Sequence, residues 1–316
     1  MKSIIYLLVL SFLWGSAFMW TKELLDVFKP PTIVFFRCLF GLVALLPFVL
    51  LQKNRIHLKI RPFFVFVLAL GAAIPWNIMA FSLQGIDTSL SGILNATTPL
   101  FALLFSVIIL KARPLWNQAT SLLIGFVAVT VLILFSSQST GVQFSIFHAF
   151  LMFAVTMAYA LNSIWIKKYY TNIPTIHLGF WTLFISAIIN GIISVFMEPF
   201  AFKHLGSWEI ILPLLILGCL CAGLGYVIFY QIISIGGPIL ASMVTFISPF
   251  VTIVLGIFFL QEPFHLGIII GMPLMILGLL LMNIHIFKRN VTLIKSGYIP
   301  PNIINEDNAR NGDNAS

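Results

Sequence analysis

The amino-acid sequence predicts an all-α polytopic membrane protein, in which ten transmembrane helices form two inverted five-helix repeats. Three observations predict this fold: an apolar composition, ten apolar runs of membrane-spanning length, and a motif that occurs twice. Hydrophobic residues make up 60% of the 316 positions and charged residues 8%, whereas a soluble domain has about 45–50% and about 25%. A helix of about 20 apolar residues crosses the hydrocarbon core of a bilayer.

The first five apolar runs, taken in order, form the first repeat, which we place at residues 1–137. The first run has no Ala-x-Ala cleavage site, so we expect it to stay in the protein as a helix rather than to be removed as a signal peptide. The second run contains Arg37, the one basic residue inside a predicted span. The five runs cover residues 4–20, 31–51, 63–83, 88–110 and 119–136.

The next five runs form the second repeat, which we place at residues 138–287. They cover residues 146–165, 175–196, 210–232, 239–260 and 266–287. Residues 288–316 are too polar to bury a core, and we expect a disordered cytoplasmic tail there. Cys38, Cys219 and Cys221 all fall within runs, where cysteine usually acts as a small apolar side chain. Because Cys219 and Cys221 point in different directions on a helix, they do not form a metal site, and no metal or cofactor is expected.

The distribution of basic residues predicts the orientation of the chain, because cytoplasmic loops carry an excess of Lys and Arg. With ten spans, Lys22, Lys29 and Lys203 fall on one side of the membrane. Most of the 17 basic residues fall on the other: Lys2, Lys53, Arg55, Lys59, Arg61, Lys111, Arg113, Lys167, Lys168, Lys288, Arg289, Lys295 and Arg310. Both termini should therefore be cytoplasmic. The net charge of +8 fits contact with anionic lipid, and without basic clusters interleaved with aromatics no nucleic-acid partner is expected.

The motif that occurs twice closes the fourth and the ninth runs. With Pro99 placed on Pro249, Leu90 matches Leu240 and Leu110 matches Leu260. Five helices separate the copies, so the second copy must be inverted in the membrane. The loop charges agree, because Lys111 and Arg113 follow the first copy and Gln261 and Glu262 follow the second.

Each copy also carries small or polar residues three and four positions apart, which places them on one face of a helix. The simplest interpretation is close helix packing. A polar stripe beside a proline, at matched depth in two copies, also predicts discontinuous helices that meet at a substrate site. The stripes are Gly92, Asn95, Thr98 and Ala102 in one copy and Ser242, Thr245, Ser248 and Thr252 in the other.

Further polar and aromatic residues lie at central depth in other runs, and each is a candidate either for packing or for substrate recognition. They are Trp14, Ser16, Asn77, Tyr159, Asn162, Tyr226 and Tyr230. Arg37 has two interpretations: its guanidinium faces the pathway and attracts a substrate carboxylate, or it snorkels outward to Glu23, Asp26 or a lipid headgroup.

The acidic residues all lie outside the predicted spans, which argues against a proton relay through buried carboxylates and leaves open coupling through an acid at the rim, such as Glu262. It also argues against a membrane protease, because no His-Glu-x-x-His helix and no pair of membrane Asp residues is present. No catalytic residue is therefore assigned.

The motifs together resemble those of the drug/metabolite transporter superfamily, in its ten-helix EamA-type branch. The resemblance rests on Trp14-Gly15-Ser16-Ala17-Phe18 and Arg37, and on Gly225-Tyr-Val-Ile-Phe-Tyr230, Ala241-Ser242, Pro249, Gly256 and Glu262-Pro263. It implies two tandem EamA repeats around a central cavity, in proteins that mostly export metabolites from bacterial cells. One departure is that the first repeat reads Lys111-Ala112-Arg113-Pro114, so a role for the acid of the turn carries over to Glu262 only.

The sequence therefore predicts a bacterial cell-membrane transporter that exports small metabolites, such as amino acids or related amphipathic compounds, by alternating access. We expect the third, fourth, eighth and ninth helices to frame the pathway. Two other functions stay open: an enzyme acting on a lipid-linked substrate, and a receptor or assembly subunit with a vestigial cavity. The expected partners are a small-molecule substrate and the lipid bilayer, and both a monomer and a homodimer are compatible with the sequence.

Overall fold

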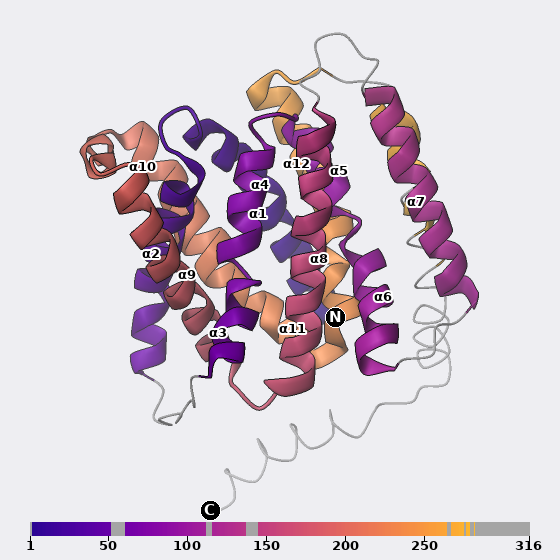
Figure 1. The fold of residues 1–316 in the computed structure, drawn as a ribbon, viewed down its shortest axis with the longest axis horizontal. Coiled ribbons are helices and arrows are strands. Elements are labelled where there is room, and N and C mark those ends of the chain that lie inside the picture. The colour runs from indigo at the N-terminus through magenta and orange to yellow at the C-terminus, as the bar shows by residue number, and fades with distance from the viewer. Residues whose placement is uncertain are drawn as a thin grey trace, which may run out of the picture.

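A computed structural model describes residues 2–51, 61–111, 116–136, 145–263, 267–274, 276–278 and 281. The predicted tail at residues 288–316 and part of the tenth predicted span, including residues 282–287, lie outside these residues. The described chain is a bundle of helices that run side by side, with α7 at one edge (Figure 1). The all-α fold predicted from the sequence is confirmed.

The helices of the first repeat begin close to the predicted positions, and proline opens several of them. Pro30, Pro62 and Pro99 occupy first-turn positions, where the missing N–H costs no hydrogen bond. The third and fourth predicted spans are each divided into two helices. The elements are α1 (Lys2–Leu24), α2 (Pro30–Leu50), α3 (Pro62–Ala69), α4 (Ala73–Ser82), α5 (Thr88–Asn95), α6 (Thr98–Leu110) and α7 (Trp116–Ser136).

The second repeat has the same order of long helices. Its eighth span passes through a π-helix, η2 (Ile216–Leu224), and reaches Gly237, whose φ of 80° ends regular helix before Pro238. The other elements are α8 (Ile146–Tyr169), α9 (Thr175–Met197), a 3-10 turn (Ala201–Gly206), α10 (Trp208–Leu215), α11 (Gly225–Ser242) and α12 (Val244–Leu260).

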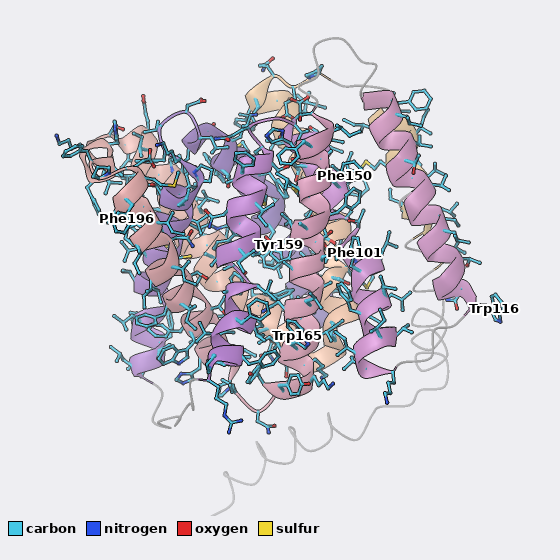
Figure 2. All side chains as sticks on the ribbon, in the orientation of Figure 1. Phe101, Trp116, Phe150, Tyr159, Trp165 and Phe196 are labelled. Carbon is cyan, nitrogen blue, oxygen red and sulfur yellow. The ribbon has the colours of Figure 1, made fainter. Side chains whose placement is uncertain are left out.

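Within the described residues, seven helical stretches are long and apolar enough to cross a membrane, by length and composition. Many large apolar side chains lie on the outside of the bundle, among them Phe12, Phe48 and Phe196. Figure 2 shows Phe196 and Trp116 at the edges of the bundle and Tyr159 near its centre. An apolar surface of this extent is costly in water and suits lipid contact, so the protein is a multi-pass membrane protein.

The helices approach closely where glycine replaces larger residues, which is how helices associate in lipid. A Cβ atom on Gly41 of α2 would lie 2.9 Å from the carbonyl oxygen of Gly218 in η2. A Cβ atom on Gly15 of α1 would lie 2.7 Å from the carbonyl oxygen of Ser248 in α12. These contacts join elements of the first repeat to elements of the second, so the two repeats form one bundle.

The predicted repeat is visible in the backbone at its two ends. Lys111 follows α6 with φ 53° and ψ 32°, and Gln261 follows α12 with φ 55° and ψ 32°. They are the only non-glycine residues with positive φ in the described chain. Their separation equals that of Pro99 and Pro249, so the two copies end in the same left-handed cap.

Candidate functional site

Regular α-helix is interrupted in the helices that the sequence predicted to frame the pathway. The third span breaks at residues 70–72 and the fourth at residues 96–97. The eighth span contains the π-helix η2, and Met243 separates α11 from α12 in the ninth. By contrast, α1, α2, α7, α8 and α9 are each continuous. Breaks and π-helices inside membrane helices occur where protein or a water-filled cavity surrounds the backbone, and they are frequent at functional sites.

The breaks in the third and eighth spans are stabilised in equivalent ways. Asn162 of α8 donates through Nδ2 to the Val67 carbonyl at 2.8 Å, just before the break in the third span. Trp14 of α1 donates through Nε1 to the Cys221 carbonyl in η2 at 3.1 Å. In each case the first helix of one repeat hydrogen-bonds to the interrupted third helix of the other. Backbone groups that have left the regular pattern thereby gain partners within the protein.

Other polar side chains form hydrogen bonds at the break in the third span and in α4, which follows it. The Tyr226 hydroxyl donates to the Gly71 carbonyl. Asn77 donates through Nδ2 to the Ala73 carbonyl at 2.6 Å and to Oδ1 of Asn190 at 2.5 Å. These bonds hold the break against α11 and hold α4 against α9.

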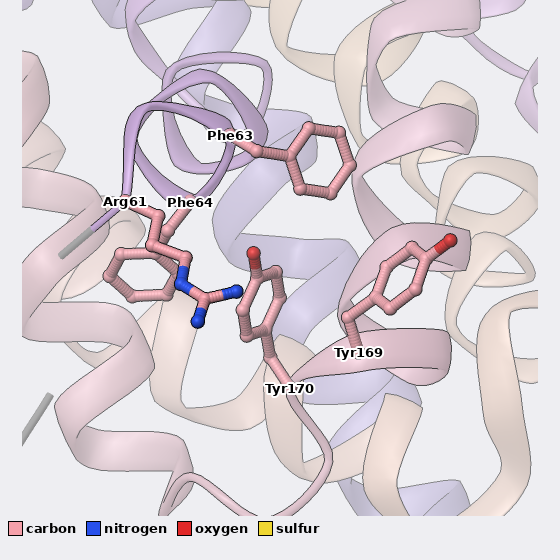
Figure 3. A pocket seen from close by; sticks show the side chains of 5 residues that line it. All are labelled: Arg61, Phe63, Phe64, Tyr169 and Tyr170. Atoms are coloured by element: carbon pink, nitrogen blue, oxygen red, sulfur yellow. The ribbon is translucent and has the colours of Figure 1, made fainter. Parts of the chain in front are cut away.

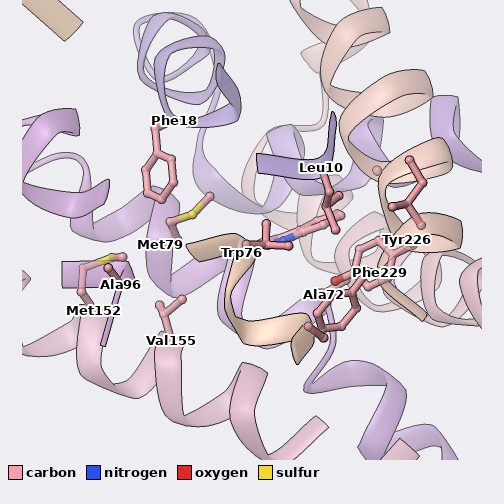
Figure 4. Packing of buried hydrophobic residues seen from close by; sticks show 14 of the residues in the cluster. Leu10, Phe18, Ala72, Trp76, Met79, Ala96, Met152, Val155, Tyr226 and Phe229 are labelled. Carbon is pink, nitrogen blue, oxygen red and sulfur yellow. The ribbon is translucent and has the colours of Figure 1, made fainter. Parts of the chain in front are cut away.

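Aromatic rings gather around the same break. Trp14 stacks on Tyr159, with ring centroids 6.3 Å apart, and lies 5.0 Å from Phe229. Tyr226 lies 5.5 Å from Trp76. Figure 4 shows Trp76, Tyr226 and Phe229 within the buried cluster. Trp14 and Tyr159 retain part of their exposed surface although both lie in mid-helix.

Arg37 lies in this aromatic cluster and is buried, with 3% of its surface exposed. Its guanidinium carbon Cζ is 3.6 Å from the centroid of the Trp76 ring, a cation–π contact. Nε has no hydrogen-bond partner among the described residues. The side chain therefore points into the bundle, and the described structure contains no ion pair from Arg37 to Glu23 or Asp26.

The two polar stripes meet each other directly. A Cβ atom on Gly92 of α5 would lie 2.9 Å from Cβ of Thr252 in α12. The hydroxyls of Thr98 and Thr245 donate to carbonyls three residues earlier in the chain, and Thr252 donates to the Gly15 carbonyl at 3.0 Å. In this conformation the stripes hold helices together, so a substrate can enter between them at this depth only if α5 and α12 move apart.

Glu262 joins the ends of the two stripe helices at one side of the bundle. Its Oε1 accepts from the Thr88 amide at 2.6 Å and from the Thr88 hydroxyl at 2.7 Å. Its Oε2 accepts from the Ser89 amide at 3.0 Å and from the Ser89 hydroxyl at 2.6 Å. The carboxylate thus caps the N-terminus of α5, where N–H groups lack helical partners and the helix dipole favours negative charge. We call this contact of Glu262 with Thr88 and Ser89 the Glu262 clamp.

A cavity of about 360 Å³ lies beside the Glu262 clamp. Lys22 is half-buried there, and its Nζ donates to the Leu83 carbonyl at 2.5 Å. The cavity is lined by Lys22, Glu23, Asp26, Asp87, Leu260, Gln261, Glu262 and Pro263. Within the described residues, no group of three or more His, Cys, Asp or Glu side chains is arranged to hold a metal ion.

The opposite side of the bundle has a larger cavity of about 520 Å³, lined by Arg61, Phe63, Phe64, Tyr169 and Tyr170. Figure 3 shows the Arg61 guanidinium between the rings of Phe64 and Tyr170. Partial burial raises the pKa of the Tyr170 phenol, and the positive charge of Arg61 opposes that rise.

Comparison with known proteins identifies the family. The chain matches the EamA-like transporter family over residues 1–134 and 146–284. The chain belongs to the EamA-like transporter family. Its relatives include the uncharacterized transporter YoaV of Bacillus subtilis, 20% identical over 91% of this chain and 98% of the relative. The uncharacterized transporter YvbV of the same species is 22% identical over 89% and 92%.

A solved crystal structure has the same fold as this EamA-like transporter. The TM-score is 0.67 at 15% sequence identity, and the match covers 90% of this chain and 96% of the other. Both of the relatives from Bacillus subtilis are named transporters.

The EamA-like fold brings together most of the candidates at central depth. Trp14, Tyr159, Asn162 and Tyr226 surround the break in the third span. Tyr230 lies beside Tyr226 and shares a hydrogen bond of 2.7 Å with Thr182. The Ser16 hydroxyl donates to the Leu13 carbonyl of its own helix at 2.9 Å. Ser242 does the same with Ile239 at 2.8 Å.

The stripe residues Asn95 and Ser248 are buried, and each has a polar side-chain atom with unused hydrogen-bonding capacity. Neither Oδ1 of Asn95 nor Oγ of Ser248 has a hydrogen-bond partner among the described residues. Burying such an atom without a partner costs about 1–3 kcal/mol, so these groups are suited to bind something that the fold itself does not supply.

Sequence reasoning missed Trp76 and Asn190. Asn190 lies within the seventh run and meets the criterion that selected Asn77, so it was detectable from the sequence. Trp76 directly precedes Asn77 in the third run, but only the fold shows that its ring makes a cation–π contact with Arg37. The sequence identified Glu262 as an acid at the rim. Its hydrogen bonds with Thr88 and Ser89 were not predictable, because these residues lie far from Glu262 in the chain.

Proposed function

We propose that this EamA-family transporter exports small amphipathic metabolites, amino acids or related compounds, by alternating access between the cytoplasm and the exterior. The observation that supports this proposal most is the distribution of helix interruptions. They occur in the third, fourth, eighth and ninth spans, whereas the first, second, fifth, sixth and seventh spans are continuous in the described chain. Transporters with inverted repeats use discontinuous helices near the membrane midplane to bind substrate.

The contacts at the two sides of the bundle support alternating access. One side is held by the Glu262 clamp and by Lys22. The other is held by contacts from α8, where Lys167 donates to the Ser234 carbonyl at 3.2 Å and Lys168 to the Ile109 carbonyl at 3.4 Å. Separate contacts at each side allow one side to open while the other stays closed.

The distribution of basic residues supports a cell-membrane protein with both termini in the cytoplasm, and the Glu262 clamp then lies on the external side. Two of the relatives come from Bacillus subtilis, which supports a bacterial cell. Export of a metabolite would begin with binding from the cytoplasmic side.

Metabolite release from cells provides the test. Medium from deletion and overexpressing strains is compared by metabolomics, and candidate compounds are then tested in proteoliposomes. Overexpression should raise the extracellular level of a small set of metabolites, and the purified protein should carry them. Asn95→Leu should reduce the flux at least tenfold, because a buried polar group of the stripe is replaced by an apolar one.

Thr120→Val is a matched control. Thr120 is exposed on α7, and its hydroxyl donates only to carbonyls of its own helix. This variant should transport as well as the wild type. If a broad metabolite panel gives no flux above that of Asn95→Leu, the proposed function is wrong.

A further inference from the structure

The charge on Arg37 has no compensating anion within the described structure. The acidic residues that the structure describes lie in loops or at helix ends: Glu23, Asp26, Asp87, Glu198, Glu209 and Glu262. The ionisable groups that experience the Arg37 charge are the thiols of Cys38 and Cys221 and the phenols of Tyr159 and Tyr226. Thiols and phenols are uncharged at neutral pH, so none of them balances the guanidinium.

An uncompensated cation at this depth is costly. Arg37 is seven residues inside α2, or about 10 Å from its start at about 1.5 Å per residue. Charged residues inside membrane segments usually face the bundle interior, are paired, and mark substrate pathways. The cation–π contact with Trp76 offsets part of the cost, because such a contact contributes about 2 kcal/mol or more when desolvated. It leaves Nε of the guanidinium unused, and no described residue accepts from it.

We infer that Arg37 is the anion-binding residue of the transport site, and that the substrate is an organic monoanion with an apolar body rather than a zwitterionic amino acid. This inference rests on the proposed transport function. A guanidinium binds a carboxylate through two parallel hydrogen bonds, and it does so most strongly where water is excluded.

The surroundings of Arg37 define both the charge and the body of the substrate. No second cation lies within the aromatic cluster of Trp14, Trp76, Tyr159 and Tyr226 in the described residues. A single positive charge balances a single negative one, so a phosphate dianion or a dicarboxylate would bring an uncompensated charge into the bundle. Trp14 and Tyr159, which keep part of their surface exposed, offer aromatic faces to an apolar body.

Ligand-induced shifts in melting temperature of the detergent-purified full chain provide the test. Four compounds share a phenyl body and differ in charge: phenylacetate, phenylacetamide, 2-phenylethylamine and phenyl phosphate. At tens of millimolar, phenylacetate should raise the melting temperature by several degrees. The neutral amide, the cation and the dianion should each give less than half of that shift. Equal shifts from phenylacetate and phenylacetamide would overturn the inference.

Variants locate the bound anion. Arg37→Met should abolish the difference between phenylacetate and phenylacetamide, and Arg37→Lys should retain a smaller difference because it keeps the charge without the planar fork. Arg61→Gln is the matched control. Arg61 also lies among aromatic rings, but its cavity is at the start of α3, whereas the break follows the end of α3. This variant should keep the full phenylacetate shift. If it alone loses the shift, the anion binds at Arg61 and the inference fails.

The stability of the unliganded variant separates a binding role from a structural one. Without ligand, Arg37→Met should melt at the wild-type temperature or above, because an unpaired buried charge has been removed. A variant that fails to fold, or melts well below the wild type, would show that the fold already compensates the guanidinium, and it would contradict the inference.

Transport and binding can fail separately. A flux of neutral or cationic metabolites that Arg37→Met leaves unchanged would overturn this inference while the proposed function stands. Phenylacetate binding through Arg37 without flux of any metabolite would instead overturn the proposed function.

Discussion

The two sides of the bundle are built from equivalent parts of the two repeats. We call them the Glu262 end, which contains Lys22 and Glu262, and the Lys111 end, which contains Lys111 and Lys167. Lys22 closes α1 and donates to the Leu83 carbonyl after the third span, and Lys167 closes α8 and donates to the Ser234 carbonyl near the end of the eighth. In each repeat, a lysine at the end of the first helix thus donates to a carbonyl at the end of the third span, and the two contacts lie at opposite ends of the bundle.

The two ends differ in how the stripe helices are held. At the Glu262 end, a carboxylate accepts four hydrogen bonds from Thr88 and Ser89. At the Lys111 end, the position that matches Glu262 is Ala112, which lies outside the described residues. The positions that match Thr88 and Ser89 are Pro238 and Ile239, which offer no hydroxyl, and Pro238 offers no N–H either.

A repeat can therefore keep its backbone geometry while its polar contacts diverge. Both members of the clamp are absent from the Lys111 end, the acid as well as its donors, so a single substitution would not restore it. Since charge-assisted hydrogen bonds are about twice as strong as neutral ones, the Glu262 end should be the more costly to open. The resting protein is then expected to open first at the Lys111 end.

The largest effect should come from Glu262→Ala, which removes the acceptor of four hydrogen bonds. The loss should destabilise the Glu262 end by about 2–4 kcal/mol, because buried donors are left without partners. Hydrogen–deuterium exchange measures this directly, since the amides of Thr88 and Ser89 are the donors. Their exchange should accelerate roughly a hundredfold, at about 1.4 kcal/mol per factor of ten.

Gln261→Asn is the control for Glu262→Ala. Gln261 is exposed, its Nε2 donates only to the Phe258 carbonyl, and asparagine tolerates the left-handed conformation of that position. The control should leave exchange at Thr88 and Ser89 unchanged. Equal acceleration in both variants would mean that the turn, and not the carboxylate, protects the start of α5.

A smaller effect is expected from Gly256→Ala, which leaves the carboxylate in place but obstructs it. A Cβ atom on Gly256 would lie 2.5 Å from Oε2 of Glu262 and 2.8 Å from the Ser89 hydroxyl oxygen. Overpacking of this kind costs about 1–3 kcal/mol. Exchange at the start of α5 should accelerate by roughly tenfold.

The double variant Gly256→Ala/Glu262→Ala tests whether the two changes act on the same contact. If they do, the exchange rate should be close to that of Glu262→Ala alone, because mutations that share a partner are not additive. Full additivity would place the effect of Gly256→Ala elsewhere in α12.

Much of this architecture was predictable from the sequence, because it depends on local patterns. Long apolar runs predicted the helices, and the offset between Pro99 and Pro249 that predicted the repeat also separates the matching caps at Lys111 and Gln261. The break in the fourth span lies directly before Pro99, as the proline suggested. The ninth span behaves differently, since α12 begins at Val244 and continues through Pro249.

The remaining features depend on contacts between distant segments. Gly71 and Pro75 are local signals of the break in the third span, because Pro75 has no N–H to donate to the Gly71 carbonyl. The partners that stabilise the break, Asn162 and Tyr226, come from other helices. The cation–π contact of Arg37 with Trp76 likewise joins α2 to α4. Patterns along a chain report the period and length of each element, whereas these contacts are fixed only when the helices pack.

The smallest expected difference separates Lys22 from Lys167, which occupy equivalent positions. Lys22 is half-buried beside Asp87, Glu262 and Asp26, so Lys22→Met removes a hydrogen bond and also leaves these carboxylates less compensated. We expect a loss of about 1 kcal/mol, against less than about 0.5 kcal/mol for Lys167→Met, whose hydrogen bond is exposed to solvent. Thermal unfolding in detergent, repeated at high salt, measures both losses. Added salt should reduce the effect of Lys22→Met more than that of Lys167→Met, because among the described residues acidic side chains surround Lys22 and not Lys167. Equal losses with the same salt dependence would show that the two ends are held with similar strength, and the contrast between them would then rest on the Glu262 clamp alone.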